Sequence, residues 1–149
     1  MGLKGEGIYD ERVWMVKSHH PERAGSDMLD ANKCVLVVRN PLDAIMSLFH
    51  IVATGTHNCS VHPDDFDAWY PLFEKFVKQE IVIWKEFHSY WCDGGVPIPT
   101  FIVRYEDLVK NKKQTLKQIF CFLLNVDSIE NTLISEIIDQ HSGDAQIYK

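Results

Sequence analysis

An arginine and a serine lie in one short segment where they could bind an anion together. Arg39 follows the uninterrupted apolar run 34–38, which is typical of a strand covered on both faces of a sheet. Pro41 fits the first turn of a helix, and Ser47 then falls two turns into that helix. Ligands of open α/β sheets bind at the carboxyl ends of the strands. The segment therefore predicts a site in which Arg39 and Ser47 bind an anion such as a phosphate.

The elements that would position these residues follow from hydrophobic periodicity and from turn residues. Strands alternating with helices predict an α/β fold with a parallel sheet, right-handed crossovers and three layers, of which only part is expected in this chain. Asp64 or Asp65 is expected to cap a long helix, whose wide apolar stripe is expected to pack in the core. Strands are predicted at 13–18, 34–39 and 99–104, and helices at 41–53, 66–91, 105–110, 113–124 and 129–139.

Composition narrows the class of protein. A chain of 149 residues with 46% apolar and 24% charged residues is long enough to bury a core and is not disordered. A formal net charge of −6 argues against general nucleic-acid binding, which favours a basic face. No apolar run approaches the roughly 18 residues of a membrane-spanning helix, and no signal peptide is visible. A membrane anchor is therefore expected only outside this chain.

The four cysteines have no spacing typical of a metal site, and no metal is predicted. Cys34 falls in the apolar strand and Cys121 on an apolar helical face, where both are expected to be inert. Cys59 and Cys92 fall in segments that are expected to be loops. The alternative for these two is a disulfide formed in a secretory compartment.

Three segments together resemble the sulfotransferases that use PAPS (3′-phosphoadenosine-5′-phosphosulfate). Residues 39–47, Arg-Asn-Pro-Leu-Asp-Ala-Ile-Met-Ser, resemble the family's 3′-phosphate-binding segment. Residues 17–19, Lys-Ser-His, resemble its Lys-Thr-His, with serine in place of threonine. Residues 105–108 match its Tyr-Glu-Asp-Leu. The resemblance covers roughly residues 13–124, and it implies a P-loop NTPase-like fold and PAPS as the co-substrate.

The resemblance also implies a role for each site residue. Arg39 and Ser47 would bind the 3′-phosphate, and Tyr105 would contact the adenine, because its ring can pack on a purine while its hydroxyl donates. His19 would be the general base for the acceptor hydroxyl, and Lys17 would stabilise charge on the bridging oxygen. Because side chains i and i+2 of a strand point the same way, Lys17 and His19 are expected side by side.

Plainer interpretations of the same residues stay open. Lys17 could be an ordinary lysine of an edge strand, His19 a loop histidine with His20 acting as the base instead, and Ser47 a serine that faces solvent. Glu106 and the aspartate after it are expected only to favour the first turn of a helix through its dipole.

Two family segments do not occur in these 149 residues, namely the Pro-Lys-Ser/Thr-Gly loop that binds the 5′-phosphosulfate and the Arg-Lys-Gly-type segment. Residues 1–149 are therefore expected to be a partial sulfotransferase domain. The acceptor would be a glycan or a small alcohol or phenol. A Golgi location is expected for a longer protein, with the cytoplasm as the alternative. A non-catalytic relative that only binds the nucleotide, and another P-loop-type enzyme such as a small-molecule kinase, are the other hypotheses.

Overall fold

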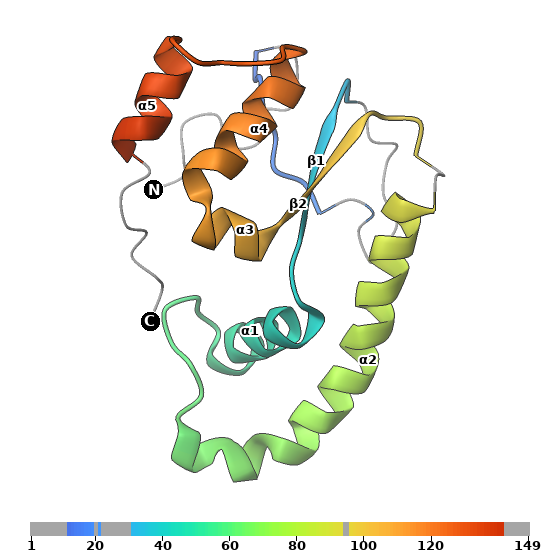
Figure 1. Ribbon diagram of the computed structural model, residues 1–149. Helices are drawn as coiled ribbons and strands as arrows, with labels where there is room; N and C mark the ends of the chain where they lie inside the picture. The colour runs from blue at the N-terminus through green and yellow to red at the C-terminus, as the bar shows by residue number, and fades with distance from the viewer. Residues whose placement is uncertain (1–11, 20, 22–30, 94–95, 142–149) are drawn as a thin grey trace. The chain divides into compact units, whose positions relative to one another are not determined.

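The computed structural model describes residues 12–19, 21, 31–93 and 96–141 (Figure 1). The chain divides into two compact units, residues 1–30 and 31–149. The helices and strands assigned among the described residues all belong to the second unit. In chain order they are β1 (Cys34–Val38), α1 (Pro41–Thr54), the 3-10 turn η1 (Pro63–Asp65), α2 (Phe66–Cys92), β2 (Thr100–Arg104), α3 (Tyr105–Lys110), α4 (Lys112–Leu124) and α5 (Leu133–His141).

The first unit differs from the prediction. Residues 12–19 contain no strand, so the strand expected at 13–18 is wrong for this structure. A strand needs a neighbour to satisfy its backbone N–H and C=O groups. In the part of the chain that is described, the sheet consists of β1 and β2 alone. Three apolar residues of the segment, Trp14, Met15 and Val16, are exposed, with Trp14 at 66%.

The second unit contains the small parallel sheet that the alternation of elements predicts. β1 and β2 pair in parallel, with Cys34 opposite Thr100 and Val38 opposite Arg104. Figure 1 shows the two strands ending on the same side, where one continues into α1 and the other into α3. The structure thus confirms an α/β arrangement with parallel strands, whereas the P-loop NTPase-like type stays a prediction.

Helix α1 begins where the proline predicts. The Asn40 side-chain oxygen accepts a hydrogen bond from the Leu42 N–H at 2.9 Å, which satisfies a donor that has no partner within the helix. Pro41 is the first helical residue. The helix ends at Gly55, whose φ of 68° lies in the left-handed region that glycine adopts without strain. Asn40 therefore fixes the direction in which the chain leaves β1.

An aromatic cluster joins α1 to α2. Phe49 of α1 is only 1% exposed, and its ring lies 5.0–6.3 Å from four aromatic rings, measured between centroids. These rings belong to Phe66, Trp69, Phe73 and Phe76 of α2, and most of the contacts are edge-to-face, the geometry that aromatic quadrupoles favour. The cluster packs α1 against α2 and so fixes the helix on which Ser47 lies.

The apolar stripe of α2 is only partly core. Trp91 is buried, but Leu72 is 52% exposed, and Ile81 is exposed as well. The prediction that the whole stripe packs in the core is therefore wrong for those two residues. Pro71 lies inside the helix, where it removes one backbone hydrogen bond. Figure 1 shows α2 curving in this first part.

The start of α2 also differs from the expected capping. Asp65 occupies the capping position, but its side chain makes no capping hydrogen bond. The imidazole of His62 instead accepts from the Asp64 N–H at 3.3 Å and caps the preceding turn η1. The long helix is therefore introduced by a 3-10 turn rather than by an aspartate cap.

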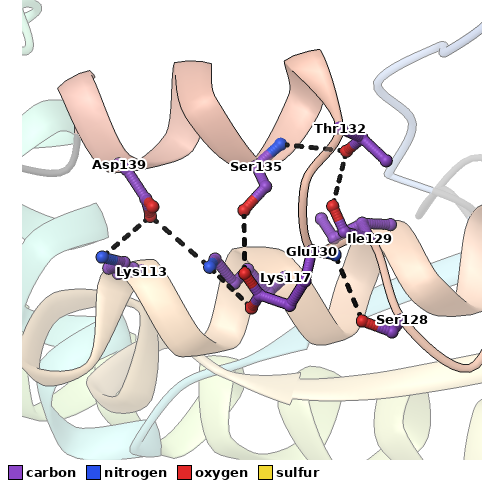
Figure 2. A network of polar contacts seen from close by, with 8 residues as sticks. All are labelled: Lys113, Lys117, Ser128, Ile129, Glu130, Thr132, Ser135 and Asp139. Carbon is purple, nitrogen blue, oxygen red and sulfur yellow. Dashed lines mark hydrogen bonds and ion pairs between the residues drawn. The ribbon is translucent and has the colours of Figure 1, made fainter.

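Polar contacts join α4 to α5 across their facing surfaces (Figure 2). The Lys113 ammonium lies 2.8 Å from the Asp139 carboxylate, and the Lys117 ammonium lies 3.5 Å from the same group. Lys117 also lies 2.8 Å from Glu130, which accepts a hydrogen bond from the Ser135 hydroxyl at 3.4 Å. Lysines of α4 thus pair with carboxylates of α5 and of the segment that connects the two helices.

The structure bears on the alternative of a disulfide between Cys59 and Cys92. Cys59 and Cys92 are free and exposed, so the disulfide alternative is not supported. Cys59 precedes α2 and Cys92 ends it, and a helix of 27 residues separates its ends by about 40 Å, far beyond the reach of a disulfide.

Among the described residues, no helix has both the length and the apolar character needed to span a membrane. The Golgi and cytoplasmic alternatives stay predictions.

Candidate functional site

Two of the predicted site residues meet at the carboxyl end of the sheet. Val38 and Arg104 are partners in the parallel register, so Arg39 and Tyr105 each follow the last residue of a strand at the same level. The guanidinium carbon of Arg39 lies 4.6 Å from the centroid of the Tyr105 ring. This is a cation–π contact, which places the positive charge of Arg39 over the face of the Tyr105 ring. Residues 66 positions apart in the sequence therefore form one unit at the strand ends.

A shallow hollow surrounds this pair. It combines a guanidinium, an ammonium, two carboxylates, an aromatic ring and an apolar side chain. A cation beside an aromatic ring suits a ligand that carries both an anionic group and a planar ring system. The residues that line the hollow are Arg39, Asp43, Tyr105, Glu106, Val109 and Lys110.

Glu106 connects the two strand ends through a backbone hydrogen bond. Its Oε1 accepts from the Asn40 N–H at 2.9 Å, and its Oε2 lies 3.9 Å from the Nε of Arg104. The Asn40 N–H lowers the pKa of the Glu106 carboxyl most, followed by the glutamate's own N–H and then by Arg104 and Arg39, while burial opposes these effects. Glu106 is therefore a carboxylate at neutral pH.

This role of Glu106 is not predicted from the sequence. Its position in the first turn of a helix predicts only an interaction with the dipole, and that interaction needs no particular partner. The sequence does contain a signal for this contact. Glu106 follows the end of one strand, and Asn40, whose backbone N–H can donate, follows the end of the other. Only the strand register shows that the two segments face each other.

Ser47 lies near this hollow but does not line it. It is half-buried on α1, one turn beyond Asp43, and residues four apart share a helix face. Asp43 does line the hollow, so Ser47 continues the same side of the helix away from Arg39. The structure therefore brings Arg39 and Tyr105 into contact and leaves Ser47 a turn further along.

Lys17 and His19 belong to the first unit, whereas the other predicted site residues belong to the second. Both side chains are exposed. His20, the alternative base, lies outside the described residues. The roles of Lys17 and His19 stay predictions. In the described part of the chain, no group of three or more potential ligands could bind a metal ion.

Comparisons with known proteins identify relatives of this chain. The family model described as "Sulfotransferase domain" matches residues 10–142. Sulfotransferase 6B1 of Gorilla gorilla gorilla is 27% identical over 121 residues, which cover 79% of this chain and 38% of the relative. A WSCD family member of Aedes aegypti is 29% identical over 126 residues, covering 82% of this chain and 38% of the relative. The chain thus spans 38% of the length of these curated relatives. No solved structure matches the chain significantly.

Proposed function

The chain belongs to the sulfotransferase family, and from this premise we propose that it binds PAPS at the carboxyl ends of β1 and β2 and serves the transfer of the sulfuryl group to an acceptor hydroxyl. The contact between Arg39 and Tyr105 is the observation that supports the proposal. The two residues were predicted separately, one for a phosphate and one for an adenine, and they touch. The family match gives no support to the kinase hypothesis.

The geometry of the pair suits the 3′-phosphoadenosine part of PAPS. A guanidinium that stacks on a ring keeps its N–H groups in the guanidinium plane, so that two of them can donate to two phosphate oxygens. The Tyr105 ring can contact an adenine through surface that Arg39 leaves free, since this side chain is 38% exposed. In this proposal the Ser47 hydroxyl adds a further hydrogen bond to the 3′-phosphate.

The proposed chemistry uses the other two predicted residues. His19 takes the proton of the acceptor hydroxyl as the acceptor oxygen bonds to sulfur. The bond from sulfur to the bridging oxygen breaks, and the negative charge that remains on the 5′-phosphate of the leaving nucleotide is stabilised by Lys17. The acceptor would be a glycan or a small alcohol or phenol. A relative that binds the nucleotide without catalysing transfer would use the same Arg39 and Tyr105.

A titration tests the binding step. Calorimetry with 3′-phosphoadenosine-5′-phosphate should show binding at least about tenfold tighter than with 5′-AMP, because a bidentate charged contact is worth roughly that much. Arg39→Ala should remove the preference for the 3′-phosphate. Lys85→Ala is the control, since it removes a cation from the exposed surface of α2 that does not line the hollow. Equal binding of both nucleotides by the folded chain, or no binding of either, would contradict the proposal.

A further inference from the structure

Asn40, the residue that follows Arg39, is held by two hydrogen bonds, one at its backbone N–H and one at its side chain. Glu106 of α3 accepts the Asn40 N–H at 2.9 Å. The Asn40 side chain accepts the Leu42 N–H, also at 2.9 Å, at the start of α1. The first contact comes from the neighbouring strand end and the second from the following helix. The backbone on the carboxyl side of Arg39 therefore has little freedom to rotate.

The side chain of Arg39 is restrained as well. Its guanidinium lies over the ring of Tyr105, the residue that directly precedes Glu106. Two consecutive residues of α3 thus act on this segment: Tyr105 contacts the Arg39 head group, and Glu106 accepts the N–H of Asn40, the residue that follows Arg39. An arginine loses much side-chain entropy when it is fixed, and a site that fixes it before binding reduces this cost for the ligand.

We propose that Glu106 is a positioning residue that orients Arg39 for the anionic group of the nucleotide. The inference rests on the proposed function, because it assigns Arg39 a phosphate to bind. Glu106 acts through the Asn40 N–H, and it does not itself contact the ligand's anion. Two glutamate oxygens with separate partners, Asn40 and Arg104, keep the carboxylate in this orientation.

The negative charge of Glu106 has an opposing effect on the same site. Glu106 and Asp43 line the hollow together with Arg39 and Lys110, and a carboxylate repels a bound phosphate. The hydrogen bond that positions Arg39 therefore comes with a charge that weakens anion binding. A substitution that keeps the acceptor oxygen and removes the charge separates the two effects.

Three variants separate the positioning effect of the Glu106 hydrogen bond from the repulsive effect of its charge. Glu106→Gln keeps a side-chain oxygen that can accept the Asn40 N–H, so its affinity for 3′-phosphoadenosine-5′-phosphate should equal or exceed that of the wild type. Glu106→Ala removes the acceptor and should weaken that affinity about tenfold while changing the affinity for 5′-AMP by less than about twofold. Asp107→Ala is the matched control, because it removes another first-turn carboxylate of α3, and it should change neither affinity beyond about twofold.

A nuclear magnetic resonance measurement tests positioning without any nucleotide. The Tyr105 ring should shift the Arg39 Nε–H resonance in the wild-type chain, because the guanidinium lies over that ring. The shift should persist in Glu106→Gln and disappear in Glu106→Ala. The backbone amide spectrum of each variant shows whether it is folded. If Glu106→Ala does not fold, the Arg39 Nε–H resonance of Glu106→Gln alone tests the positioning role.

The outcomes separate this inference from the proposed function. An Arg39 resonance that is unchanged in a folded Glu106→Ala would overturn the positioning role even if the wild-type chain binds the nucleotide. Loss of the ring shift in a folded Glu106→Gln would overturn it too, because the acceptor oxygen is still present. A wild-type chain that shows the expected resonances but binds no nucleotide would support the positioning of Arg39 and contradict the proposed function.

Discussion

Arg39 has to satisfy two requirements with one side chain. Its guanidinium lies over the Tyr105 ring, and in the proposed site it also donates to a phosphate. A planar guanidinium can do both because its ring contact uses a face and its hydrogen bonds use an edge. An ammonium group has no face to stack and donates from a single nitrogen. The choice of arginine at this position thus follows from the geometry as well as from the charge.

We expect Arg39→Lys to bind 3′-phosphoadenosine-5′-phosphate about tenfold more weakly than the wild type, although the charge is unchanged. Calorimetry measures the difference, with 5′-AMP as the ligand that lacks the 3′-phosphate. A lysine variant that binds as tightly as the wild type would show that charge alone is sufficient, and the stacking argument would then be wrong.

Phe49 carries the packing of α1 on α2. It is the largest of the fully buried side chains among the described residues, and four aromatic rings of α2 surround it. Phe49→Ala should lower the free energy of unfolding by about 3–5 kcal/mol, because it removes buried surface and leaves a cavity. Urea unfolding followed by tryptophan fluorescence measures the change.

Phe49→Leu is the control for that experiment, since it keeps most of the apolar volume and should have a clearly smaller effect. A loss below about 1 kcal/mol for the alanine variant would mean that the cluster can collapse onto the space or that α1 is fixed mainly by other contacts.

At the scale of the elements, local rules account for most of what the sequence predicts. Pro41 marks the start of α1, Gly55 marks its end, and the apolar runs mark both strands to within one residue. These signals act within a few residues of the chain. The contact between Arg39 and Tyr105 could be anticipated because parallel strands end at one edge, and the family resemblance supplied the role of each residue.

The remaining features depend on partners that periodicity does not identify. Residues 13–18 have the composition of a strand, but a strand forms only beside a neighbour. Leu72 and Ile81 fit the apolar stripe of α2 and are nevertheless exposed, because no described element covers them. Glu106 was missed for the same reason, since its partner lies 66 residues away in the sequence.

The carboxyl end of α4 depends on a lysine that lies just before β1. The Lys33 ammonium donates to the carbonyls of Phe122 at 2.5 Å and Leu123 at 3.1 Å, and to the side-chain oxygen of Asn125 at 2.5 Å. The Phe122 carbonyl also accepts the Asn125 N–H at 3.4 Å, and the helix dipole favours a cation at this end. Lys33 therefore attaches α4 to the strand that leads to Arg39.

Lys33→Met should lower the free energy of unfolding by about 1–2 kcal/mol, because it removes the charged donor while keeping the apolar stem. Thermal unfolding followed by circular dichroism measures the effect. Lys85→Met, on the exposed surface of α2, is the matched control and should change stability by less than about 0.5 kcal/mol. Equal effects of the two substitutions would show that the capping contacts of Lys33 contribute no net stability.

At the scale of the whole molecule, several paired carboxylates make stability depend on pH. The pKa of Glu130 is lowered chiefly by its hydrogen bond with Lys117, and the pKa of Asp139 chiefly by its hydrogen bond with Lys113. A carboxyl group whose pKa is lower in the folded state stabilises the fold when it is ionised. Its contribution is complete above the ordinary values of 4.5 for glutamate and 3.8 for aspartate. It is lost as the pH falls through the lowered values.

We therefore expect the stability of the chain to decrease as the pH falls below about 5, and the decrease to be smaller in the double variant Glu130→Gln, Asp139→Asn. These groups face the lysines of α4 across an exposed surface, so each contributes modestly and the effect comes from their sum. Urea unfolding at a series of pH values measures it, with Glu86→Gln on the exposed surface of α2 as the control. Should the double variant lose as much stability on acidification as the wild type, the attachment of α5 to α4 would rest on buried residues such as Ile119 and Ile138 rather than on the charges in Figure 2.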